Sequence, residues 1–323
     1  MRALLILVIL LTFTALPGSA QEDEIVANLA GGRVILHVAA DGIVFGAIDH
    51  PLEAKSVPPR VAAIGYAHVG IFFGASEWQI PAQPQPIRLD RDISEIRPSN
   101  TRNTYRPPGS GEADLELIGT GFLEKLRPLV SQLHHKIELK PDEPLVEIVL
   151  VGYAPQGYGP EVWLIDYHAE QQSVSAKGDF WQTRILRPSF NQLYPPEKHQ
   201  PKTLVEVRFP ETLQEVPLTG LFQQNDPRIT QLCASDARFR RTVELIEKGQ
   251  ANKVPMEEAG DFLRAVLPFV AGNAHFVEGQ VGETGGFQWI VPPEEPREKA
   301  QRGEDKDRPA DAPTLMRKPN PEH

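Results

Sequence analysis

Two side chains that could act in acid–base chemistry, Asp49 and His50, follow an apolar run directly, and Arg60 comes shortly after them. A carboxylate beside an imidazole can orient the ring or share a proton with it, as general acid–base catalysis requires. Ser56 would complete the residue types of a hydrolytic triad, but no serine of the chain lies in a Gly-x-Ser-x-Gly elbow. Asp49, His50 and Arg60 are therefore the candidate catalytic residues. The alternative is a strand end whose polar groups serve the backbone.

A second set of candidates is aromatic and consists of Tyr153, Tyr158, Trp163 and Tyr167. Aromatic rings line many small-molecule sites because they bury a large apolar area of the ligand. Packing between sheets is the alternative, since aromatic residues also dominate protein cores. The sequence leaves both interpretations open.

The chain contains no motif that predicts a metal or cofactor site. A zinc site needs three or four converging ligands, and the sequence has neither a His-Glu-x-x-His motif nor a pair of cysteines. His37, His50 and His68 fall on or beside expected strands and are interpreted as structural histidines. The stretch 152–157 lacks the lysine and the strand-to-helix context of a phosphate-binding loop. We expect no metal and no cofactor.

Residues 1–20 have the composition of a secretory signal peptide. Arg2 makes the N-terminal end positive, residues 4–13 are almost wholly apolar, and small residues precede a cleavage point after Ala20. This run is too short to span a bilayer as a helix, which takes about 20 residues. We predict export to the periplasm or to the outside of the cell. The alternative is an uncleaved N-terminal anchor, and no later segment is apolar enough to form a second span.

The overall composition predicts one globular domain followed by a charged tail. The 323 residues are 41% hydrophobic and 24% charged, which allows a sizeable core. The net charge of −10 argues against binding to nucleic acid or to an anionic membrane. Residues 292–323 hold 15 charged residues and 7 prolines among 32, so we predict a disordered tail. Residues 24–291 are then the single domain.

The only cysteine, Cys233, excludes an internal disulfide. Its helical spacing from Ile229 and Leu232 predicts a buried and unreactive thiol.

Apolar periodicity predicts the elements that carry the candidate residues. Asp41-Gly42 between two apolar runs is a strong hairpin signal, because both residues tolerate the backbone of a tight turn. The expected strands are residues 33–39, 43–48, 60–63, 69–73, 146–151, 162–168, 181–186, 204–209 and 285–291. The expected helices are residues 114–139, kinked at Pro128, then 236–249 and 259–270. We interpret residues 21–28 as a polar arm and residues 188–201 as a loop.

Three of these hairpins resemble those of proteasome-type subunits, members of the N-terminal-nucleophile hydrolases. Residues 35–49 (ILHVAADGIVFGAID) are similar to the first hairpin of that family, and residues 60–75 (RVAAIGYAHVGIFFGA) to the next. Residues 149–167 (VLVGYAPQGYGPEVWLIDY) are similar to a later pair of strands. The resemblance covers residues 35–167 and implies an α+β fold. That fold is an αββα-like sandwich of stacked antiparallel sheets flanked by helices, and the family assembles into rings.

The catalytic residues that this resemblance requires are mostly missing. The family uses a Thr, Ser or Cys at the start of the mature chain, with its own α-amino group as the base. That position falls near Gly31 or Gly32, and signal cleavage would expose Gln21, so no nucleophile is available. Asp49 lies near the family's strand-end aspartate, one residue later than usual. Arg60 lies about where the family has its catalytic lysine, but arginine keeps its proton.

The expected function is therefore that of an exported, non-catalytic binding or assembly protein on a proteasome-like scaffold. We expect a protein or peptide partner and self-association into a homo-oligomer. Two alternatives remain open: an exported peptide or amide hydrolase with a displaced nucleophile near Asp49, His50 and Arg60, and a protein that binds a small ligand through the aromatic set.

Overall fold

The computed structural model describes residues 25–50, 60–64, 68–80, 85–93, 111–134, 143–154, 159–174, 176, 180–195, 204–210 and 226–293. The expected signal peptide, Ser56, Tyr158 and the tail beyond residue 293 lie outside these residues.

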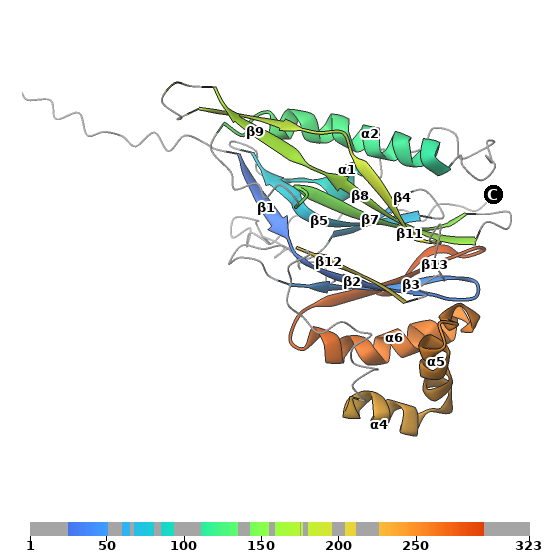
Figure 1. Cartoon of the computed structure of the whole chain (residues 1–323). Helices are drawn as coiled ribbons and strands as arrows, with labels where there is room; N and C mark the ends of the chain where they lie inside the picture. The colour runs from blue at the N-terminus through green and yellow to red at the C-terminus, as the bar shows by residue number, and fades with distance from the viewer. Residues whose placement is uncertain are drawn as a thin grey trace, which may run out of the picture.

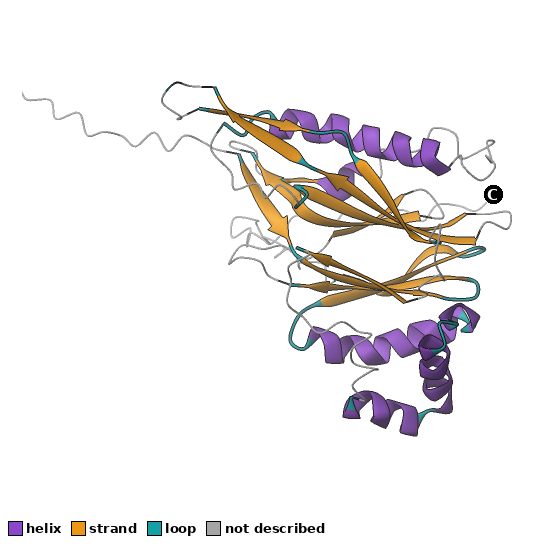
Figure 2. Cartoon of the chain, viewed as in Figure 1, coloured by secondary structure: helices purple, strands orange, loops and turns teal. Residues whose placement is uncertain are grey.

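The chain folds as an α+β sandwich in which two antiparallel sheets stack between layers of helix (Figures 1 and 2). This confirms the expected fold class. One sheet, called sheet A, contains β1 (Val26–Ala30), β4 (Arg60–Ile64), β5 (His68–Gln79), β6 (Ile87–Arg88), β7 (Val146–Ala154), β8 (Gly159–Tyr167) and β11 (Ser189–Tyr194). The other, sheet B, has the order β12 (Leu204–Phe209), β2 (Gly32–Val38), β3 (Gly42–Asp49), β13 (Phe276–Gly282) and β14 (Gly286–Val291).

Helices cover the outer face of each sheet (Figure 2). Helix α2 (Gly111–Val130) lies on sheet A, beside the short α1 (Leu89–Ile93) and the ribbon of β9 (Ala169–Ser173) and β10 (Trp181–Ile185). On sheet B lie α4 (Pro227–Ser235), α5 (Ala237–Glu247), the 3₁₀ turn η1 (Ala251–Lys253) and α6 (Met256–Ala271).

Strand alternation divides the apolar side chains among three cores. In β2, Leu36 faces sheet A and belongs to the inter-sheet core. Its neighbour Ile35 points to the opposite side of the strand and faces the helices. Between α2 and sheet A, residues such as Phe122 and Ile148 form an α2-side core. Beneath sheet B, Phe262 and its neighbours form a helical-layer core. The central strands of each sheet are therefore buried on both faces.

The hairpin predicted at Asp41-Gly42 is confirmed. Strands β2 and β3 pair from Gly32↔Asp49 to Val38↔Ile43, and the Ala39 amide donates to the Gly42 carbonyl at 2.8 Å. The Asp41 carboxylate also accepts from the Met256 amide at 2.8 Å. The turn thus positions the first residue of α6 on sheet B.

Helix α2 ends earlier than the periodicity predicts. Its last residue is Val130, and the amides of Gln132 and Leu133 bond three residues back, to Leu129 and Val130. The side chains of Ser131 and Gln132 both donate to the Pro128 carbonyl, at 3.0 and 2.8 Å. The exposed carbonyls of the last turn are thereby satisfied locally, which ends the helix.

Among the described residues, eight elements were not predicted from the sequence: β1, β6, α1, β9, β11, α4, η1 and β13. The segment interpreted as an arm is in part β1, an edge strand paired with β5. The segment interpreted as a loop after Pro188 contains β11, which pairs with β8. Both interpretations were wrong because these short strands give a weak apolar signal: β1 exposes Val26 and Leu29, and β11 carries three polar residues.

Candidate functional site

Asp49 lies at the end of β3, opposite Gly32 at the start of β2. Its amide donates to the His275 carbonyl at 2.9 Å, and the His50 amide donates to the Gly31 carbonyl at 3.1 Å. These backbone bonds fix the strand end between β2 and β13. The structure thus places Asp49 beside the glycines where the resemblance expects a nucleophile.

The Asp49 carboxyl is only partly compensated by its surroundings. Its Oδ1 atom is buried and accepts no hydrogen bond. Burial raises the pKa of this carboxyl, while the nearby His275 and His50 act in the opposite direction. A carboxyl with an unused buried oxygen is a candidate for binding a hydrogen-bond donor or for holding a proton.

Arg60 does not join Asp49. Its guanidinium donates to Glu77 Oε2 at 2.9 Å, and the Asn28 side chain donates to Glu77 Oε1 at 3.0 Å. This polar set links β4, β5 and β1 within sheet A. The hydrogen-bond partner of Arg60 is therefore Glu77 of sheet A, whereas Asp49 and His50 are adjacent at the end of β3 in sheet B.

The aromatic candidates are distributed over different cores. Tyr153 belongs to the inter-sheet core, and its hydroxyl donates to Glu283 at 3.4 Å. Tyr167 is fully buried in the α2-side core, where its hydroxyl donates to the Gly119 carbonyl at 2.9 Å and burial raises its pKa. Trp163 packs against that same core from a partly exposed position. Tyr153 and Tyr167 therefore face opposite sides of sheet A.

A histidine–carboxylate pair lies at the start of β5, at the end of the strand opposite to Glu77. This pair was not predicted from the sequence. His68 Nε2 is 2.6 Å from Glu161 Oε1, and Trp163 Nε1 donates to Glu161 Oε2 at 3.0 Å. Because the carboxylate accepts, Nε2 carries the proton and Nδ1 is the basic nitrogen. Burial favours neutral Glu161, but the His68 and Trp163 hydrogen bonds outweigh burial and lower its pKa.

Gly152 makes room for this pair. His68, Gly152 and Glu161 stand in one row across β5, β7 and β8. A Cβ on Gly152 would lie 2.0 Å from the Cδ2 atom of His68, so any side chain there would displace the ring. The residues are far apart in sequence, and only strand register brings them together. The one local signal was a glycine inside a strand, which marks close approach of another group.

Further carboxylates face the inter-sheet side near the Asp49 end of the sandwich. Glu147 on β7 lies directly opposite Asp166 on β8, and burial raises the pKa of Asp166. Within the residues that the structure describes, no group of three His, Cys, Asp or Glu side chains could hold a metal ion.

Comparison with known proteins gives no family for this chain. No protein-family model and no curated protein matches it. Among the described helices, none is long and apolar enough to cross a membrane.

Proposed function

We propose that this chain is an exported, non-catalytic binding or assembly protein built on a scaffold like that of the N-terminal-nucleophile hydrolases. The αββα order of layers is the arrangement that the sequence resemblance implies. The partner is a protein or peptide, or further copies of the same chain. By non-catalytic we mean that this chain lacks the mechanism in which the first residue of the mature protein is the nucleophile.

This proposal rests on the observation that the residues before Gly32 form a strand of the sandwich. Residues Val26–Ala30 form β1, which pairs along β5 from Val26↔Gln79 to Ala30↔Gly74. Ala30 is fully buried, so this segment is part of the sandwich. Gly32 has no side chain that could attack, and its nitrogen lies in a peptide bond and cannot act as an α-amino base.

Arg60 gives independent support. A lysine near the nucleophile can change its protonation state, whereas an arginine keeps its charge. Here the guanidinium is engaged with Glu77 at 2.9 Å. This arrangement stabilises the start of β4 and supplies no proton to a reaction at Gly32.

Sequencing the N-terminus of the mature protein tests the missing nucleophile. The expected first residue is Gln21, and a mature chain that starts at Thr, Ser or Cys would contradict the proposal. Light scattering on the purified protein tests assembly: an oligomer in the micromolar range is expected. A strict monomer that also captures no protein or peptide would count against a binding role.

The His68–Glu161 pair favours one second candidate, an exported hydrolase in which His68 activates water. An oriented imidazole with a free basic nitrogen is the minimum of a general base. Amide and ester substrates should then be cleaved with a rate that falls about 10²- to 10⁴-fold in His68→Ala. Glu161→Gln should reduce the rate as well, and Asp49→Ala should leave it unchanged. Equal background in all variants would exclude this candidate and support the first.

A further inference from the structure

A carboxyl group lies completely buried between sheet B and its helices. Glu278 on β13 is 0% exposed, and its backbone lies between Gly46 of β3 and Val291 of β14. Above it on α6 is Gly260, where a Cβ would lie 3.9 Å from Glu278 Oε1. The backbone of α6 therefore lies directly over the carboxyl, at a distance where a Cβ would be in ordinary contact with it.

The two oxygens of Glu278 differ in their contacts. Oε1 is buried and has no hydrogen-bond partner. Oε2 lies 3.5 Å from Nε of Arg264, one turn further along α6. The Arg264 side chain is 51% exposed, so its charge is hydrated and compensates a buried carboxylate only in part.

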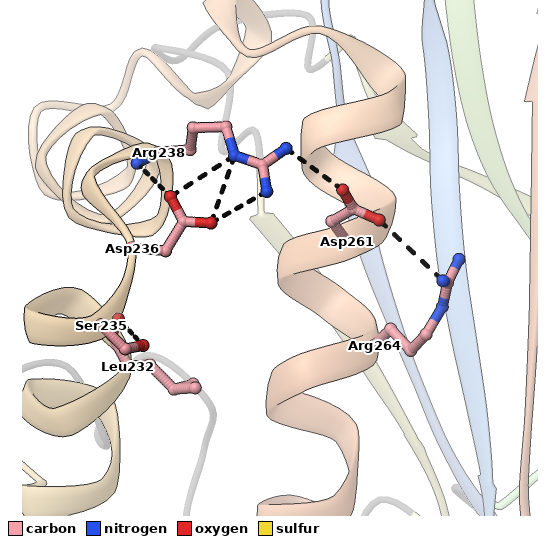
Figure 3. Close-up of polar contacts among 6 residues, drawn as sticks. All are labelled: Leu232, Ser235, Asp236, Arg238, Asp261 and Arg264. Carbon is pink, nitrogen blue, oxygen red and sulfur yellow. Dashed lines mark hydrogen bonds and ion pairs between the residues drawn. The ribbon is translucent and has the colours of Figure 1, made fainter.

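Arg264 is the last member of a chain of charges over the helical layer (Figure 3). Asp236 caps α5 and pairs with Arg238 at 2.9 Å, and Arg238 reaches Asp261 of α6 at 3.5 Å. Asp261 lies 3.9 Å from Arg264. The contact at Glu278 therefore connects sheet B, through α6, to α5.

Few other charged groups face Glu278. From α6, Asp261 favours the neutral carboxyl and Arg264 the ionised one. Strand β14 has no titratable residue, and the one on β3, Asp49, lies at the strand end. His275 precedes β13. Burial dominates and raises the pKa of Glu278 to about 7.

We propose that the buried Glu278 makes the attachment of α6 to sheet B pH-sensitive. The attachment is closed when Glu278 is neutral and loosens when Glu278 ionises, and Arg264 opposes this loosening in part. Ionisation of Glu278 places a negative charge on a buried carboxylate whose Oε1 atom has no hydrogen-bond donor. The desolvation cost of this charge falls when α6 moves away and water reaches the carboxylate. The native protein holds a proton that the opened state releases, so α6 opens more readily as the pH rises from about 4.5 to about 7.

Hydrogen exchange of the full-length protein, followed by mass spectrometry on peptides from α6, tests this attachment. After correction for intrinsic exchange, opening should increase about tenfold or more between about pH 5 and pH 7 and then level off. Glu278→Gln cannot ionise and should remove this increase. Glu257→Gln, an exposed change on the same helix, should keep it and serves as the matched control.

Arg264→Gln tests the partner. Without the cation the carboxylate of the closed state is less favoured, so the increase in opening between about pH 5 and pH 8 should be larger than in the wild type. Exchange of α6 that is independent of pH in the wild type would overturn the proposal. A pH response that survives in Glu278→Gln, or a pH response of Arg264→Gln that is no larger than that of the wild type, would do the same.

Discussion

His37 lies in β2 with its ring fully buried. Nε2 is 3.2 Å from the Ala251 carbonyl and must donate to it, while Nδ1 has no partner. Burial lowers the pKa of His37 to about 4, although the bond to Ala251 acts the other way. The ring is therefore neutral in the native protein and joins β2 to the 3₁₀ turn before α6.

This neutral histidine predicts a loss of stability in acid. His37 binds a proton near pH 6.5 in the unfolded chain and only near pH 4 in the native chain. The free energy of unfolding therefore decreases as the pH is lowered from about 6.5 to about 4. The loss is at most about 3 kcal/mol. Denaturant unfolding at several pH values should show this component in the wild type and not in His37→Gln. His134→Gln, a change at an exposed ring, should leave it in place.

At the scale of elements, two glycines control how closely α6 approaches sheet B. Gly46 on β3 faces Leu267, and a Cβ at Gly46 would lie 2.5 Å from a Leu267 methyl carbon. Gly260 lies within α6, and a Cβ there would meet Ile290 at an ordinary 3.4 Å. The first glycine is required by packing, whereas the second only lowers helix propensity.

Alanine at the two glycines should therefore have opposite effects. Gly46→Ala should destabilise the protein by about 1–3 kcal/mol because the core is overpacked. Gly260→Ala should be neutral or stabilise it by up to about 1 kcal/mol. Chemical denaturation measures both. A large loss in Gly260→Ala would mean that the carboxyl of Glu278 needs the space above it.

At the scale of the whole molecule, the sheets connect the three cores. Sheet A contributes Phe72 to the α2-side core and Phe73 to the inter-sheet core. Sheet B contributes Phe45 to the inter-sheet core and Val44 to the helical-layer core. Since successive residues of one strand serve different cores, loss of one core exposes a face of the sheet that also forms the next.

This sharing predicts one cooperative unfolding transition. Phe122→Ala, in the α2-side core, and Phe262→Ala, in the helical-layer core, should each lower the stability of the whole molecule by about 3–5 kcal/mol. Circular dichroism and tryptophan fluorescence should report the same midpoint in both variants. Two separate midpoints would contradict the prediction of a single domain over residues 24–291.

The sequence by itself determined the elements with strong local signals. Asp41-Gly42 between apolar runs specified the β2–β3 hairpin, and Asp236 with the stripe of α5 specified a capped helix. The apolar runs of β2, β3 and β7 predicted strands. These features depend on residues a few positions apart, where backbone geometry alone fixes which side chains share a face.

Only the tertiary structure decided which distant residues meet. Asp49 and His50 stayed neighbours, but Arg60 went to Glu77, and the aromatic candidates went to different cores. His68 met Glu161 across Gly152, and Arg264 met Glu278 beneath α6. Strand register and the stacking of layers set these contacts, and both arise from burial summed over whole sheets. No short stretch of sequence carries that information.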